Sequence, residues 1–81
     1  MPRPHAATLV FEYPDPEAAA LVEASVAQEL DEIAGDRTEA SLARDGADLT
    51  VEVAADDLTA LRAGLNTWTT LVAVAESVGG T

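Results

Sequence analysis

The side chains able to do acid–base or metal chemistry in this chain of 81 residues are one histidine and fifteen acidic residues. His5 lies in a proline-rich N-terminal segment with no cysteine, serine or second histidine near it, so we interpret it as a frayed surface residue. Neighbouring acids offer oxygen atoms to a divalent cation at Asp31-Glu32, Asp45/Asp48 and Asp56-Asp57. So many acids form such pairs by chance, and no EF-hand or zinc spacing is present. We predict no catalytic residue, no metal site and no cofactor.

Three other motifs bear on function. The sequence contains neither a glycine-rich phosphate loop nor a Gly-x-Ser-x-Gly nucleophile turn. Gly79-Gly80 invites comparison with ubiquitin-like modifiers, which are activated at a terminal diglycine. Here Thr81 follows the pair, and the glycines come after a predicted helix rather than a strand. We therefore interpret the two glycines as a helix stop.

The charge is strongly one-sided. Four basic residues, all of them arginine, give a net charge of -11 and an isoelectric point near 4.1, yet 48% of the residues are hydrophobic. That apolar content predicts a folded domain rather than a disordered acidic tail. The charge excludes binding to nucleic acid or to an anionic membrane through a basic patch. Acidic surfaces without lysine resemble those of proteins from extreme halophiles, since high salt screens the repulsion between the acids.

Localisation is predicted from the same composition. The sequence has no cysteine, its N-terminus has no hydrophobic signal region, and no apolar run approaches the roughly 18 residues of a membrane span. We expect no membrane contact and a cytoplasmic protein.

The first half of the chain predicts a strand followed by a helix. Residues 6–13 alternate with the period of a half-buried strand and place on one face Ala7, Leu9, Phe11 and Tyr13. Asp15 and Pro16 then have the positions of an N-cap and a first helical residue. Apolar residues three and four apart predict a helix over residues 16–34, with an inner face of Ala18, Leu21, Val22, Val26, Leu30 and Ile33. Gly35 is the expected C-cap.

A hairpin is predicted in the middle of the chain. Residues 37–44 and 48–55 flank Asp45-Gly46, and this pair favours a hairpin because glycine adopts positive φ at little cost. With a last helix, the order is strand, helix, strand, strand, helix. We predict a single α+β domain over residues 1–81, with a three-stranded antiparallel sheet and two helices on one face. Residues 1–5 are expected to be a disordered arm and residues 79–81 a frayed end.

The last helix is predicted to start at a cap formed by Asp56 or Asp57 and to reach about Val78. At about 100° per residue, a core-facing stripe is made of Leu58, Leu61, Leu65, Trp68, Val72 and Ala75. A second arc of small and apolar residues contains Ala60, Ala63, Gly64, Thr67, Thr70, Leu71, Val74 and Val78. Because small residues let another helix approach closely, this arc either packs on the first helix or is a docking surface for a partner.

The first strand is a candidate for homodimer formation. A three-stranded sheet leaves two edges without a neighbouring strand, and an exposed edge is a template for pairing with another chain. We place the dimer edge at Thr8, Val10 and Glu12.

The last helix also carries a family resemblance. It contains the run Asp57-Leu58-Thr59-Ala60-Leu61-Arg62-Ala63-Gly64-Leu65-Asn66-Thr67-Trp68, followed by Leu71-Val72 and Ala75-Glu76. This run is similar to the signature of the small dimerisation subunit of the archaeal and eukaryotic KEOPS complex. The length and the order of elements also match, so the resemblance extends over nearly the whole chain. The sequence departs from the pattern at Thr67, where serine is common, and at Thr69 or Thr70, where a basic residue often lies.

The resemblance implies a noncatalytic scaffold subunit of a complex that attaches threonylcarbamoyl to the adenosine beside the anticodon of tRNA. The chemistry would belong to a separate ATPase-fold catalytic subunit, and the small subunit would form a homodimer and dock its helices on that subunit. Carried over to this sequence, the docking contact is expected at Ala60, Gly64, Thr67, Leu71, Val74 and Val78. The complex would bring tRNA indirectly, and candidate RNA contacts on this chain are Arg37, Arg44 and Arg62.

One alternative from another class stays open. A small ferredoxin-like regulatory or ligand-sensing domain shares much of this topology. Such domains usually have a fourth strand, for which the sequence leaves no room after Val78.

Overall fold

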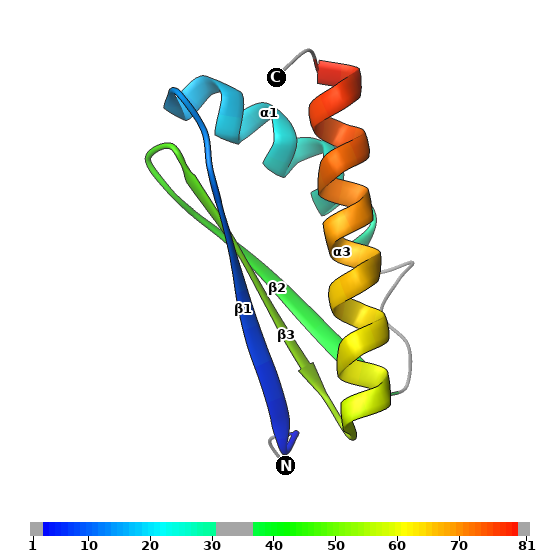
Figure 1. The fold of residues 1–81 in the computed structure, drawn as a ribbon. Helices are drawn as coiled ribbons and strands as arrows, with labels where there is room; N and C mark the ends of the chain where they lie inside the picture. Colours follow the sequence, from blue (N-terminus) through cyan, green and yellow to red (C-terminus); the bar gives the residue numbers. More distant parts are fainter. Residues whose placement is uncertain (1–2, 31–36, 80–81) are drawn as a thin grey trace.

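A computed structural model describes residues 3–30 and 37–79. The elements in these ranges are β1 (His5–Glu12), α1 (Pro16–Ala27), β2 (Thr38–Asp45), β3 (Asp48–Ala55) and α3 (Leu58–Gly79). The strands form one antiparallel sheet in the order β1-β3-β2, and both helices cover the same face of it (Figure 1). The predicted α+β fold and order of elements are confirmed.

The hairpin supplies the central strand of the sheet. β3 pairs with β1 on one side and with β2 on the other. Because α1 and α3 pack on its inner face, that face is fully buried, at Leu49, Val51, Val53 and Ala55. Asp45 pairs with Asp48 across the turn, and Gly46 has a φ of 61°. That is the first central position of a two-residue turn, where a type II′ turn requires positive φ and therefore glycine.

The N-terminal arm is ordered over its described part. β1 begins at His5, which pairs with Ala55, and the Arg3 guanidinium donates a hydrogen bond to Asp56 Oδ1 at 2.6 Å. Residues 3–5 were expected to be disordered. The expectation missed them because the partner of Arg3 lies 53 positions away in the sequence.

The first helix is capped as predicted but ends earlier. Asp15 is in extended geometry (φ −155°), and its carboxylate accepts a hydrogen bond from the backbone N–H of Ala18 at 2.8 Å. α1 ends at Ala27, where Glu29 N–H bonds to Val26 O at 3.0 Å, three residues back. Residues 28 and 29 form a turn and Leu30 is helical again. The rest of the predicted helix, residues 31–34 with Ile33, and the Gly35 cap lie outside the described residues.

The core lies between β3 and the two helices, and its largest side chain is Trp68 of α3, which is 2% exposed. The aspartate that caps α3 is Asp57, whose carboxylate accepts a hydrogen bond from Ala60 N–H at 2.8 Å. The prediction that Leu58 and Leu21 belong to the core is wrong: Leu58 is 62% exposed and Leu21 is 56% exposed. Leu58 is the first residue of α3 and lies roughly 80° around the helix from Trp68, away from the centre of the buried stripe.

Gly64 sets how closely α3 approaches the sheet. A Cβ atom at this position would lie 3.0 Å from Val53 Cγ1 and 3.7 Å from Thr38 Cγ2. Val53 is fully buried on the central strand and has little room to move. The absence of a side chain at residue 64 therefore allows the helix to sit directly on β3.

Candidate partner-binding surfaces

The outward side of α3 carries an uncharged strip, here called the α3 surface, made of Asn66, Thr67, Thr70, Leu71, Val74 and Val78. Asn66, Thr67, Thr70 and Leu71 line a shallow hollow of about 330 Å³. Val74 is 54% exposed and Val78 is 84% exposed, whereas Leu71 is half-buried. The structure thus brings together four of the residues expected to contact a partner, Thr67, Leu71, Val74 and Val78.

Ala60 and Gly64 were expected in the same contact, but they face inward. Ala60 is 9% exposed, and Gly64 packs on Val53 and Thr38. Val53 of β3 and Thr38 at the start of β2 lie against this part of the helix. Just before the helix, Asp56 N–H bonds to Arg37 O at 3.0 Å. Spacing along the helix could not show that one end of the arc is buried and the other exposed, because the burial is caused by residues elsewhere in the chain.

Asn66 and Thr70 also line the hollow, beside Thr67 and Leu71. Thr70 belonged to the predicted arc but not to the six expected contact residues, and Asn66 belonged to neither. In the sequence, Asn66 and Thr70 are four residues apart, as are Thr67 and Leu71, so each pair lies along one side of the helix. This spacing could have indicated that the four residues share a surface. The Thr67 hydroxyl donates a hydrogen bond to Ala63 O at 2.9 Å within the helix. With its hydroxyl satisfied in this way, Thr67 adds apolar surface to the strip.

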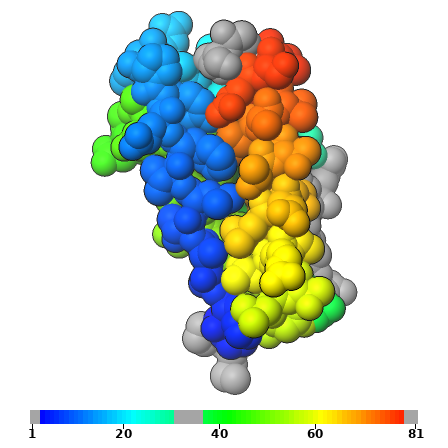
Figure 2. All heavy atoms as spheres, in the orientation of Figure 1, coloured from blue at the N-terminus to red at the C-terminus, as the bar shows by residue number. Residues whose placement is uncertain are grey.

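The sheet order makes β1 an edge strand, the position that dimerisation through this strand requires. Thr8, Val10 and Glu12 are exposed, and Val10 is 57% exposed. Their side chains point to the face of the sheet away from the helices, while Ala7, Leu9 and Phe11 are half-buried against the core. Figure 2 shows β1 beside α3 on one face of the molecule.

The arginines proposed as RNA contacts are dispersed and mostly ion-paired. Arg37 pairs with Asp57, and Arg44 Nε donates to Glu23 Oε1 at 3.1 Å. They lie near opposite ends of β2, roughly 23 Å apart at about 3.3 Å per residue. Arg62 is exposed on α3 and has no hydrogen bond or ion pair with the described residues. The described part of the chain therefore presents no basic patch.

Tyr13 and Glu76 join the end of β1 to the last turns of α3. The Tyr13 hydroxyl donates a hydrogen bond to Glu76 Oε2 at 2.7 Å. Partial burial, the hydrogen bond and the carboxylate charge all raise the pKa of Tyr13 above its ordinary value of 10.0. Since the folded-state pKa is the higher one, this contribution to stability is complete below pH 10 and is lost as pH rises through the raised value. The sequence placed Tyr13 on the inner face of the strand but held no sign of its partner.

The acidic pairs are the side chains that could hold a metal ion. Over residues 3–30 and 37–79, no group of three or more histidine, cysteine or acidic side chains is arranged to hold a metal ion. Asp56 and Asp57 are each paired with an arginine, and Asp31-Glu32 lies outside the described ranges. In the same ranges, no helix combines the length and the apolarity needed to cross a bilayer.

The comparisons with known proteins gave a family match. No curated protein matches the chain. The described residues form three strands, without the fourth strand usual in ferredoxin-like regulatory domains. The family model described as "Transcription factor Pcc1" matches residues 6–79, from β1 to the end of α3. Because this match covers nearly the whole chain, the protein belongs to the Pcc1 family, the family of the noncatalytic small subunit of the KEOPS complex.

Proposed function

We propose that this chain is the scaffold and dimerisation subunit of a KEOPS complex for tRNA threonylcarbamoyladenosine modification, and that its α3 surface docks on helices of the ATPase-fold catalytic subunit. Family membership supports the role in the complex. The observation that supports the docking site is the exposure of Val74 and Val78 on a helix with only two charged residues, Arg62 and Glu76. In a chain with fifteen acids, an uncharged exposed strip is suited to burial against another helix.

Val74→Asp tests this docking. The new carboxylate would be buried without a partner in the interface, which costs several kcal/mol, roughly a loss of a hundredfold or more in affinity. We expect co-purification of the catalytic subunit to be abolished while the circular dichroism spectrum stays as in the wild type, because Val74 is outside the core.

Ala73→Asp is the matched control. Ala73 is the exposed neighbour on α3, outside the α3 surface, and the substitution adds the same charge. We expect this variant to co-purify normally. Loss of the catalytic subunit with both variants, or with neither, would refute docking through the α3 surface.

Dimerisation is proposed to occur by pairing of the free edge of β1 with β1 of a second copy. Val10→Pro removes one backbone donor from this edge strand and restricts its geometry. We expect the variant to be monomeric in light scattering, whereas Val10→Thr, which keeps the donor and the branched side chain, stays dimeric. A dimer of unchanged stability in a folded Val10→Pro variant would contradict pairing through β1.

The tRNA is proposed to be reached through the assembled complex rather than gripped by this subunit. Arg37 and Arg44 are engaged with Asp57 and Glu23, so an RNA contact would have to break those pairs first. Arg62 remains the candidate for a direct contact, because it is exposed and has no ion pair among the described residues.

A further inference from the structure

The face of the sheet turned away from α1 and α3, here called the open face, is exposed and acidic. Its charged side chains are Glu12, Glu39, Asp45, Asp48 and Glu52. The one arginine in the strands, Arg44, pairs instead with Glu23 of α1. Within the described residues, the strands therefore place no basic side chain opposite these carboxylates on the open face.

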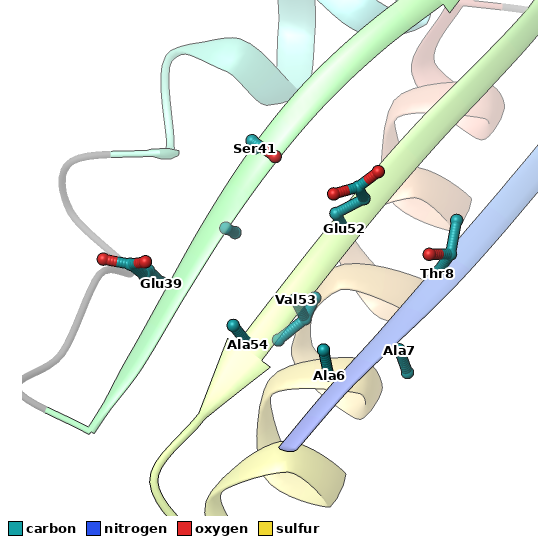
Figure 3. A pocket seen from close by; sticks show the side chains of 9 residues that line it. Ala6, Ala7, Thr8, Glu39, Ser41, Glu52, Val53 and Ala54 are labelled. Carbon is teal, nitrogen blue, oxygen red and sulfur yellow. The ribbon is translucent and has the colours of Figure 1, made fainter. Parts of the chain in front are cut away.

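A hollow of about 300 Å³ lies on this face, across all three strands. The register places Ala54 between Ala6 and Glu39 in one row. The alanines are short, so the hollow opens above them, with carboxylates at its margin (Figure 3). The hollow is large enough for the end of a long side chain.

Glu52 stands at the centre of this face. The register puts it on the middle strand between Thr8 and Ser41, and its side chain lines the hollow together with theirs (Figure 3). Glu52 has no hydrogen bond or ion pair with any residue of the described ranges. Glu39, at the margin, lies 4.0 Å from Arg3 Nε. The hollow thus offers one uncompensated carboxylate, two hydroxyl groups and small apolar side chains.

The negative charge of the open face determines which kind of partner can bind to it. A second copy placed face to face would bring like-charged carboxylates together, and nucleic acid or an anionic lipid surface would be repelled. A cationic segment of a protein would instead be attracted to this face. A guanidinium or ammonium group could pair with Glu52 while its methylene groups cover the alanines.

We propose that the open face is a second docking site, which binds a basic segment of a protein partner through an arginine or lysine side chain seated in the hollow beside Glu52. The site goes beyond the proposed scaffold function, since it uses the face opposite α3 and leaves the edge of β1 accessible. One subunit can then hold one partner on the α3 surface and another on the open face of its sheet.

The test uses a peptide probe, acetyl-Ala-Arg-Ala-Arg-Ala-amide, titrated into the isotopically labelled full chain in 0.1 M salt. We expect amide chemical shifts to change at residues 6–8, 39–41 and 52–54. Glu52→Gln should raise the dissociation constant about tenfold, the effect of losing one partly desolvated charge pair. The control Glu17→Gln removes the same charge from the exposed start of α1 and should change the dissociation constant less than about twofold.

Other results would overturn the proposal. Equal weakening by Glu52→Gln and Glu17→Gln would mean that the peptide follows net charge alone. Amide chemical-shift changes spread over the helices would also mean that the peptide binds through net charge and not in the hollow. A spin label at Thr50→Cys that broadens the open face of an unlabelled copy would show that a second copy occupies it. Val74→Asp should bind the peptide as the wild type does, so failure at the α3 surface is distinguishable from failure here.

Discussion

Trp68→Ala is expected to unfold most of the protein in buffers of low salt. Trp68 is the largest fully buried side chain and packs with Val22, Val51 and Val72 in the core. Removing such an aromatic side chain costs about 3–5 kcal/mol. A domain of 81 residues is stabilised by only about 4–12 kcal/mol at roughly 0.05–0.15 kcal/mol per residue. Urea unfolding followed by circular dichroism measures the loss, because the variant has no tryptophan fluorescence.

Trp68→Phe serves as the control, since it keeps an aromatic ring and loses less volume. It should remain folded with a lower urea midpoint. The exposed Leu58 offers a second comparison: Leu58→Ala should change the free energy of unfolding by less than about 1 kcal/mol. If Trp68→Ala unfolds at the midpoint of the wild type, the assignment of Trp68 to the centre of the core is wrong.

The second large effect is expected from salt. The chain of 81 residues has a net charge of -11, so its acidic side chains repel one another at low ionic strength. Part of this repulsion acts between neighbouring acids on the sheet. The register places Glu12 directly opposite Asp48, and Asp48 opposite Asp45, in one row across the strands. Screening at 2 M KCl shortens the Debye length to a few ångströms. We expect the free energy of unfolding to rise by at least about 2 kcal/mol between 0.1 and 2 M KCl.

High salt also strengthens apolar burial, so the charge effect needs its own control. The triple variant Glu12→Gln, Asp45→Asn, Asp48→Asn removes the row of like charges while keeping side-chain shape. It should be more stable than the wild type at 0.1 M KCl and should gain less from added salt. Sucrose, which strengthens burial without screening, should stabilise both proteins equally. A salt dependence that is the same in both would locate the repulsion elsewhere.

The strands and turns could be predicted because their signals are local. The alternation of Leu9 and Phe11 with Val10 and Glu12 reports the face of a strand, and glycine after Asp45 reports a turn. The caps at Asp15 and Asp57 likewise depend on residues only three positions ahead. Element order followed from these signals, and with it the antiparallel sheet with two helices on one face.

The α3 surface was predicted less completely because helical spacing describes only angles around α3. Ala60 and Val78 share one side of the helix, yet Ala60 is buried and Val78 is exposed. The difference depends on where the sheet lies against α3: Gly64, one turn from Ala60, packs on Val53 and Thr38, whereas Val78 lies in the last turn of the helix. Asn66 and Thr70 belong to the surface because they are exposed: no segment of the described chain covers them.

Composition and local pattern were sufficient for the acidic surface, the elements and the family, because each depends on residue types or on neighbours a few positions apart. Contacts between distant segments came only from the packed fold. The Tyr13 to Glu76 hydrogen bond spans 63 positions, and the approach of Gly64 to Val53 depends on where α3 settles on the sheet. The hollow beside Glu52 also needed the register of three strands. Such contacts depend on how the elements pack together, which no local pattern encodes.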